Sequence, residues 1–288
     1  MQGQITHIIS QAIHFIEDNL NDKLELETVA ASLHYSKFHL HRMFTKTVGL
    51  TIHEYAQRRR LTEAAKLLVF SKKSINEIAL ISGYQSQQAF TGIFKAMYKT
   101  TPAEFRDAEE FYPLQLEIRL KEELVKMEFT KDDIEFATLK DVNDWLELVS
   151  LTIDGFPCLN EANYLEVLHQ CIAENRALIL RDDDMAIGVM AFSADTSSID
   201  FLAVHPQYRS LGITKLFLDK LMDELLVGKE ISITTYRAAD KADTGYREEF
   251  YQLGFAEREL LIEYGYPTQR FVLPPKHKED TQNDKDKE

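Results

Sequence analysis

Side chains that can hydrogen-bond to the edges of bases occur in two short stretches of the chain. The first stretch holds His41 and Arg42, and the second holds Gln87 and Gln88. Arginine can pair with guanine and glutamine with adenine, each through two hydrogen bonds in the major groove. Both stretches therefore have the chemistry needed to read double-stranded DNA, provided that a helix presents them to the groove.

The two stretches belong to two copies of one pattern. Ser36 matches Ser86 and Phe44 matches Phe94, each at an offset of 50 residues. In each copy a short apolar helix is followed by a tight turn and by a second helix whose first turn the serine would cap. This pattern predicts two helix-turn-helix units in tandem and, with them, a protein that reads DNA sequence.

The second helix of each copy has one apolar face and one polar face. Leu40 and Phe44 share a face in the first copy, as Phe90 and Phe94 do in the second, at the spacing of an α-helix. The opposite faces are left for DNA. The residues predicted to contact it are Ser36, Lys37, Phe38, His41 and Arg42 in the first copy and Ser86, Gln87, Gln88, Thr91 and Lys95 in the second.

Charge is divided unevenly along the chain. The whole chain carries a net charge of −14, yet residues 1–106 hold 13 Lys and Arg against 9 Asp and Glu. The acidic total therefore hides a basic N-terminal part that suits a polyanion. Candidates for phosphate contacts are Arg58, Arg59, Arg60, Lys72 and Lys73, and a solvated surface is an equally good interpretation of each.

Metal binding and membrane insertion are not predicted. His39 and His41 are two residues apart, which turns them about 200° around a helix, so they cannot easily share one ion. Cys158 and Cys171 are too few for a disulfide framework and are expected to be core thiols. Because the chain has no signal peptide and no apolar stretch of about 18 residues, we expect a cytoplasmic protein without a membrane segment.

Residues 4–106 resemble the DNA-binding domain of the AraC family, in particular that of its monomeric activators. Two runs carry the resemblance: Ser-Lys-x-His-Leu-x-Arg-Met-Phe over 36–44 and Gly-Tyr-x-Ser-Gln-Gln over 83–88. A pure helical scaffold is the alternative interpretation. Two complete copies with polar outer faces favour a DNA-binding protein instead.

This resemblance implies roles for particular residues. The positions that contact DNA in such activators correspond here to Phe38, His41, Arg42, Gln87 and Gln88. A long helix over about 51–70 would hold the two units one turn of the duplex apart, and RNA polymerase would be the protein partner. Gly92 stands where those activators commonly carry a basic residue, so the second helix is expected to read its groove less stringently.

The chain is expected to divide into four segments. They are a DNA-binding domain at 1–106, a connector at 107–130, a second domain at 131–274 and a disordered tail at 275–288. In the connector, apolar residues at 114, 116, 118 and 120 alternate with polar ones, which predicts a short strand or an extended docking segment. The tail has too few apolar residues to form a core.

Beyond the connector the pattern changes to alternating strands and helices. The expected order is a strand at 134–137, two helices, strands at 177–180, 186–192 and 199–204, a helix at 212–226, a strand at 231–236, a helix at 244–253 and two closing strands. This order resembles the fold of the GCN5-related N-acetyltransferases, the GNAT family. The predicted fold class is therefore multidomain, with an all-α tandem helix-turn-helix domain followed by an α+β GNAT-like domain around a mixed sheet.

The sharpest local match to the GNAT family is the run Val-His-Pro-Gln-Tyr-Arg-Ser-Leu-Gly-Ile-Thr over 204–214. In that family an Arg or Gln and a glycine turn present backbone N–H groups to the pyrophosphate of coenzyme A, at the start of a helix. Thr214 departs from the usual Gly or Ala. The resemblance implies that acetyl-CoA or CoA is bound by Leu202, Val204, Arg209, Leu211, Gly212, Ile213 and Thr214.

Residues for catalysis are harder to assign. The family often places a proton-donating tyrosine where this chain has Phe250, which cannot donate a proton. Tyr246 and Tyr251 are the candidate substitutes. Asp200, on the expected fourth strand, is a candidate base acting through water, although a polar residue on a solvated strand face explains it as well.

Two functions therefore remain open. The first is a transcription regulator whose GNAT-like domain binds acetyl-CoA or another small effector. The second is a regulator that is also an active N-acetyltransferase of a small amine or a protein amine. A third and weaker interpretation makes the second domain a dimerisation or docking module. Turnover of acetyl-CoA with a panel of amines would distinguish the first two.

Overall fold

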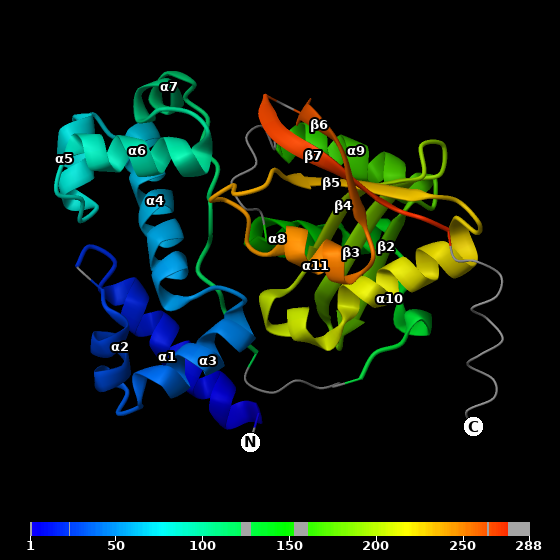
Figure 1. Cartoon of the computed structure of the whole chain (residues 1–288), viewed down its shortest axis with the longest axis horizontal. Helices are drawn as coiled ribbons and strands as arrows, with labels where there is room; N and C mark the ends of the chain where they lie inside the picture. The colour runs from blue at the N-terminus through cyan, green and yellow to red at the C-terminus, as the bar shows by residue number, and fades with distance from the viewer. Residues whose placement is uncertain (1, 23, 122–127, 153–160, 264, 276–288) are drawn as a thin grey trace.

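The computed structural model describes residues 2–22, 24–121, 128–152, 161–263 and 265–275. Its N-terminal part is helical, and its C-terminal part is a sheet between helices (Figure 1). The N-terminal helices are α1 (Gln2–Asp18), α2 (Leu26–Ser32), α3 (Lys37–Val48), α4 (Ile52–Phe70), α5 (Ile75–Ile81), α6 (Gln87–Tyr98) and α7 (Pro102–Asp107). This arrangement confirms the two predicted helix-turn-helix units, α2–α3 and α5–α6.

The long helix α4 joins two separate hydrophobic cores. Its first half contributes Tyr55 to a core with α1, α2 and α3. Its second half contributes Leu61 and Leu68 to a core with α5, α6 and α7. Thr51 caps the helix, because its side chain accepts a hydrogen bond from the Glu54 N–H while the Glu54 carboxylate accepts one from the Thr51 N–H. The predicted spacer helix over 51–70 is confirmed.

The connector is extended and lies along α4. Leu114 is buried in the second core and Ile118 in the first. The Thr62 hydroxyl accepts hydrogen bonds of 3.1 Å from the backbone N–H groups of Leu114 and Gln115. A side chain of α4, rather than a neighbouring strand, therefore accepts the hydrogen bonds of these two backbone N–H groups. Of the two alternatives, the extended docking segment is confirmed.

The C-terminal part contains a mixed sheet. Its helices are α8 (Val142–Thr152), α9 (Glu161–Ala173), α10 (Ile213–Lys220) and α11 (Tyr246–Gln252), and its strands are β1 (Glu135–Phe136), β2 (Ala177–Asp182), β3 (Met185–Ser193), β4 (Ser198–Val204), β5 (Ile231–Tyr236), β6 (Ala256–Glu263) and β7 (Tyr266–Leu273). The described strands lie in the order β1-β2-β3-β4-β5-β7-β6, and β4 and β5 are the parallel pair. This architecture confirms the predicted fold class.

Both faces of the sheet are covered. Leu178 and Leu180 point to a core with α10 and α11, whereas Ala177 and Ile179, their neighbours on β2, point to a core with α8 and α9. Cys171 is buried in the second of these cores, as expected, and Cys158 lies outside the described residues. Except for residue 275, the predicted tail also lies outside them.

Short irregular helices adjoin α10 at both ends. A 3-10 helix, η3 (Pro206–Leu211), precedes it, and a π-helical turn over Leu221–Leu225 follows it. The sequence predicted one α-helix over 212–226, so its regular part ends earlier than expected. The apolar spacing continues from the α-helix into the π-helical turn. Periodicity alone could therefore not show where the α-helix ends.

Candidate functional site

The first reading helix, α3, begins at a capped turn. The Ser36 hydroxyl accepts a 3.3 Å hydrogen bond from the His39 N–H. On the outer face Phe38 is 74% exposed and Arg42 is exposed, while His41 is half-buried. Leu40 and Phe44 are fully buried on the inner face. The helix therefore presents the side chains that the sequence assigned to DNA contact.

Lys37 has a partner within its own unit. Its ammonium donates a 2.6 Å hydrogen bond to the Glu27 carboxylate and lies 5.3 Å from the centre of the Phe38 ring. The pair is half-exposed, so water and salt screen it. A DNA phosphate could compete with Glu27 for the Lys37 ammonium. A contact between Lys37 and the phosphate would then replace the ion pair with Glu27.

The second reading helix, α6, is built in the same way. The Ser86 hydroxyl accepts a 3.2 Å hydrogen bond from the Ala89 N–H. Gln87, Gln88 and Lys95 are exposed and Thr91 is half-buried, whereas the phenylalanines at 90 and 94 are fully buried. A Cβ atom added to the exposed Gly92 would meet no described atom within 4 Å. The outer face of α6 thus has room for a larger side chain at that position.

The arginines of α4 do not form a phosphate-binding surface. Arg58 and Arg59 are 2% and 6% exposed. Arg59 forms a 2.8 Å ion pair with Glu17, and Arg58 donates a hydrogen bond to the backbone carbonyl of Ala242. Arg60 is half-buried and donates to the carbonyl of Leu20. The prediction of phosphate contacts was wrong for Arg58 and Arg59, because both are buried with long-range partners, and for the half-buried Arg60 it stays a prediction.

The parallel strands β4 and β5 separate along their length. Described pairs join Ser198 to Ser232 and Ile199 to Ile233, although β4 continues to Val204 and β5 to Tyr236. The described pairing therefore covers only the N-terminal ends of the two strands, and their C-terminal halves are free to diverge. Of the predicted cleft residues, Leu202 is half-buried and Val204 is buried. A ligand with an extended chain fits the geometry of such a split.

The turn between η3 and α10 follows the C-terminal end of β4 along the chain. Gly212 has φ +73°, and a Cβ atom there would meet no described atom within 4 Å. No described side chain caps α10 at Gly212, and backbone N–H groups at the start of a helix are suited to an anion. Leu211 is half-buried and Ile213 is fully buried. Thr214 is only 6% exposed, so little of its side chain is accessible to a ligand.

The Arg209 guanidinium lies at the boundary between the two parts of the chain. Its carbon is 5.6 Å from the centre of the Tyr246 ring. A Cβ atom added to Gly49, which follows α3, would lie 3.0 Å from its Nη1 atom. The predicted pyrophosphate-binding arginine is therefore packed against the first helix-turn-helix unit.

Two neighbours of this loop escaped the sequence analysis. His205 is 4% exposed, and burial and the nearby Arg209 charge lower its pKa to about 4. The Gln207 amide is bonded to the connector, since its oxygen accepts from the Lys121 N–H at 2.9 Å and its nitrogen donates to the Lys121 carbonyl at 2.8 Å. In the sequence, the position of His205 and Gln207 directly after the fourth predicted strand was the one feature that could have indicated a role for them.

The three candidate catalytic residues have different surroundings. Tyr246 faces Arg209, whereas the Tyr251 hydroxyl is bonded to Glu257 on β6 and its ring packs on Phe271. Asp200 is exposed and lies 3.9 Å from Arg176. Among the contacts described, none joins Asp200 to Tyr246 or to Tyr251. Among the described residues there is also no group of three metal-ligating side chains.

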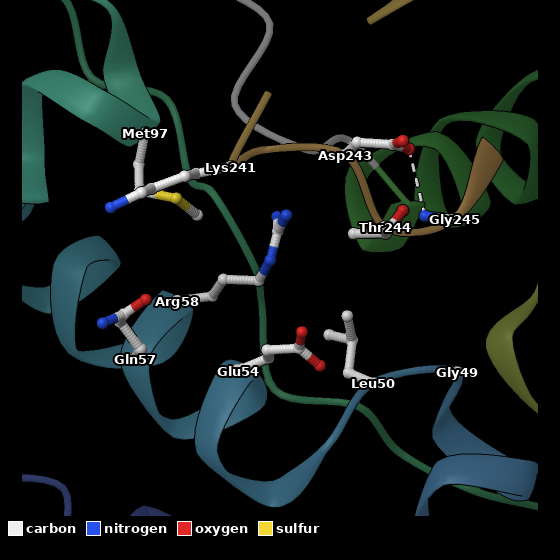
Figure 2. Close-up of a pocket in the computed structure, with 10 residues that line it drawn as sticks. All are labelled: Gly49, Leu50, Glu54, Gln57, Arg58, Met97, Lys241, Asp243, Thr244 and Gly245. Carbon is white, nitrogen blue, oxygen red and sulfur yellow. Dashed lines mark hydrogen bonds between the residues drawn. The ribbon is translucent and has the colours of Figure 1, made fainter. Parts of the chain in front are cut away.

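A cavity of about 240 Å³ lies between α4 and the segment that precedes α11. Figure 2 shows the Arg58 side chain extending from α4 toward the segment that carries Lys241 and Asp243. The Asp243 carboxylate accepts a 3.0 Å hydrogen bond from the Gly245 N–H. The walls of the cavity come from both parts of the chain, which shows that the two parts are in direct contact.

Comparison with known proteins identifies both parts. The profile of a helix-turn-helix domain family matches residues 29–108. A probable transcription factor, PqrA of Proteus vulgaris, is 42% identical over 103 residues, covering 35% of this chain and 84% of that protein. The chain belongs to the AraC family of DNA-binding transcription regulators. The transcriptional regulator Rob of Salmonella typhimurium is 37% identical over 136 residues, which cover 46% of this chain and 45% of Rob.

This AraC-family regulator also carries a GNAT domain. The profile of the acetyltransferase (GNAT) domain matches residues 151–260. A GNAT-family acetyltransferase structure from Bacillus cereus covers 50% of this chain and 97% of its own, at 14% identity and a TM-score of 0.40. No helix in the described part of the chain has both the length and the apolar character needed to cross a bilayer.

Proposed function

We propose that this regulator reads DNA through the outer faces of α3 and α6 and binds an acyl-CoA in the cleft between β4 and β5. In this proposal the protein acts in the cytoplasm, and RNA polymerase is its protein partner. Binding of an acyl-CoA to the GNAT domain would then be the signal that regulates DNA binding by the N-terminal domain. The divergence of β4 and β5 beyond Ile199 and Ile233 is the observation that carries the acyl-CoA part.

Exposure supports the proposed reading residues. Phe38, Arg42, Gln87 and Gln88 lie on outer faces, where each can enter a groove without unfolding its helix. The two helix-turn-helix units are joined by one continuous helix, α4, which suits two reading helices that must enter successive major-groove segments about 34 Å apart. A single chain would then cover both segments.

The residues around the cleft fit the shape and charge of coenzyme A. The N–H groups at the start of α10 and the Arg209 guanidinium would hold the pyrophosphate, and Leu202 would line the path of the pantetheine arm. The open space at Gly212 allows the phosphates to approach the backbone. When bound, an acyl-CoA would supply an activated acyl group as a thioester.

A sensor is better supported than an enzyme. Phe250 is 3% exposed and packs between Phe255 and Phe271, so the place of the usual proton donor is apolar and enclosed. The Tyr251 hydroxyl is hydrogen-bonded to the carboxylate of Glu257 on β6. Of the two candidate tyrosines, Tyr246 is the one with a described contact to a predicted cofactor residue, Arg209. General acid catalysis contributes about 10² to 10⁴ in rate, so turnover is expected to be slow.

Native mass spectrometry of the freshly purified full chain tests the acyl-CoA part. We expect a population heavier by the mass of CoA or an acyl-CoA, or a complete mass shift after acetyl-CoA is added. A chain that retains no such ligand and takes up none at saturating acetyl-CoA would contradict the proposal. DNA binding tested in the same sample would show separately whether the N-terminal part is functional.

A further inference from the structure

Equivalent residues end the two reading helices. Gly49 follows α3 and Lys99 follows α6, and both have left-handed backbones, with φ +81° and +61°. They are 50 residues apart, which is the offset of the tandem repeat. Each of these two residues lies at a contact with the GNAT domain. The repeat therefore meets that domain at two corresponding points.

The first contact joins α3 to the loop after β4. Arg209 on that loop lies close to Gly49, so closely that a Cβ atom at Gly49 would be 3.0 Å from the guanidinium Nη1. Gln207 on the same loop forms two hydrogen bonds with the backbone of Lys121 in the connector. The loop after β4 is thus attached both to the end of α3 and to the segment that lies along α4.

The second contact joins α6 to the loop after β5. The Lys99 ammonium donates a 2.6 Å hydrogen bond to the Asp240 carboxylate, whose side chain is 6% exposed. That carboxylate also accepts from the Ala242 N–H at 2.8 Å and from the Tyr266 hydroxyl at 3.2 Å. Because Arg58 of α4 donates to the Ala242 carbonyl, the same loop is also attached to the spacer helix.

These two loops are the ones that follow the diverging strands. Figure 1 shows that the segments after β4 and β5 both lie on the side of the GNAT domain that faces α3, α4 and α6. The cleft proposed above for acyl-CoA would lie between the same strand ends, where no pairing joins β4 to β5 in the described structure. A change in the separation of β4 and β5 would therefore be expected to shift one loop relative to the other, and each loop contacts a different reading helix.

We propose that an acyl-CoA in the β4–β5 cleft sets the placement of α3 relative to α6 through these two contacts, and so changes affinity for DNA that engages both helices. This inference rests on the proposed binding of acyl-CoA. Arg209 belongs to both functions, since it is assigned to the pyrophosphate and also packs on Gly49. Filling of the cleft and docking of α3 consequently depend on the same guanidinium.

Thermodynamic linkage relates the effect of acetyl-CoA on DNA binding to the effect of DNA on acetyl-CoA binding. If acetyl-CoA changes the DNA dissociation constant by some factor, DNA must change the acetyl-CoA dissociation constant by the same factor. Couplings of this kind are typically about 5-fold to 150-fold. Because the proposed change alters the relation between two helices, it should act on a duplex that both helices contact. A duplex in which one half is scrambled should show almost none of it.

The experiment uses the full chain, acetyl-CoA and a duplex selected by that chain from a randomised pool. Both dissociation constants are measured with and without the other ligand. Lys99→Met removes the bond to Asp240 and keeps the apolar stem. The matched control is Lys66→Met, which removes the same charge from a lysine whose 2.8 Å partner, Glu63, lies on its own helix. Thermal unfolding confirms that both variants fold.

We expect the wild type and Lys66→Met to show one reciprocal factor of at least about 5-fold, and Lys99→Met to show a factor close to one while acetyl-CoA still binds. The proposal is overturned if acetyl-CoA binds but leaves the wild-type DNA dissociation constant unchanged, or if Lys99→Met and Lys66→Met show the same factor. A chain that binds no acetyl-CoA at all would instead refute the proposed function on which the inference rests. The wild-type measurement decides the matter even if Lys99→Met does not fold.

Discussion

The Arg209 guanidinium lies 5.6 Å from the centre of the Tyr246 ring, at the start of α11. One residue was assigned to the pyrophosphate and the other to catalysis. Their contact places Tyr246 beside the arginine proposed to hold the pyrophosphate, rather than beside the candidate base Asp200. Tyr246 is therefore suited to holding the Arg209 guanidinium in place rather than to donating a proton.

Tyr246→Phe should leave acetyl-CoA affinity within about 2-fold of the wild type, because the ring over which the guanidinium lies is kept. Under the sensor hypothesis, slow background turnover of acetyl-CoA should not change either. The measurement is a titration together with a thiol-release assay on a panel of amines. Brisk wild-type acetylation that disappears in Tyr246→Phe would instead establish the enzyme.

Phe250→Tyr should lower stability rather than create a working acid. The new hydroxyl would lie among Phe255 and Phe271 in an enclosed core, where an unbonded hydroxyl costs about 1–3 kcal/mol. Chemical denaturation of the variant and the wild type measures this cost. A variant of undiminished stability with faster acetyl transfer would show that the side chain reaches the cleft after all.

Arg42→Ala should weaken binding to the selected duplex by about 1–3 kcal/mol and relax the preference at one base pair, since the exposed guanidinium is assigned to a base. Lys73→Ala, which removes an exposed charge between α4 and α5, should weaken all duplexes alike. Competition against random DNA separates the two effects. If Arg42→Ala also lowered both affinities equally, base reading by Arg42 would be excluded.

Gly92→Arg should strengthen DNA binding. The position is exposed on α6 and open to a Cβ atom, so the added guanidinium can reach the groove or a phosphate. Replacing an interior helical glycine should also stabilise the helix by about 0.8–1 kcal/mol. Gly92→Ala is the matched control, because it supplies the gain in stability without the charge. Equal DNA affinity in the two variants would place Gly92 away from the duplex.

Folding stability should fall as pH falls from about 6.5 toward 4, partly through His205. Its folded-state pKa is about 4, below the ordinary value of 6.5, so the unfolded chain binds the proton first in this range. The contribution is complete above about pH 6.5 and amounts to up to about 3 kcal/mol. His205→Asn can keep an acceptor for the Gln207 N–H and should flatten this part of the profile. An unchanged slope would assign the loss to other groups.

Local patterns predicted much of the fold and of the reading surface. Ser36 and Ser86 cap the helices that they were expected to cap, because a cap depends on residues three positions away. The buried faces of α3 and α6 follow directly from helical spacing. The order of strands likewise follows from short apolar runs and turns.

Long-range contacts could not be predicted in this way. Arg58 has its carbonyl partner at Ala242, and Arg59 has its carboxylate at Glu17, so neither partner is visible in the pattern of α4. Three consecutive arginines appear equally suited to phosphate until the fold is known. The same reasoning applies to Gln207, whose role depends on where the connector lies.

Isothermal titration of acetyl-CoA into the full chain tests the central claim most directly, with Gly212→Asp compared against Gly228→Asp. Both glycines have φ near +70°, and a Cβ atom at either would meet no described atom within 4 Å, so backbone strain and added charge are matched. Only Gly212 lies at the start of α10, where an added carboxylate would repel the phosphates. We predict that the wild type and Gly228→Asp bind acetyl-CoA and that Gly212→Asp does not. Equal binding by all three proteins would contradict the account.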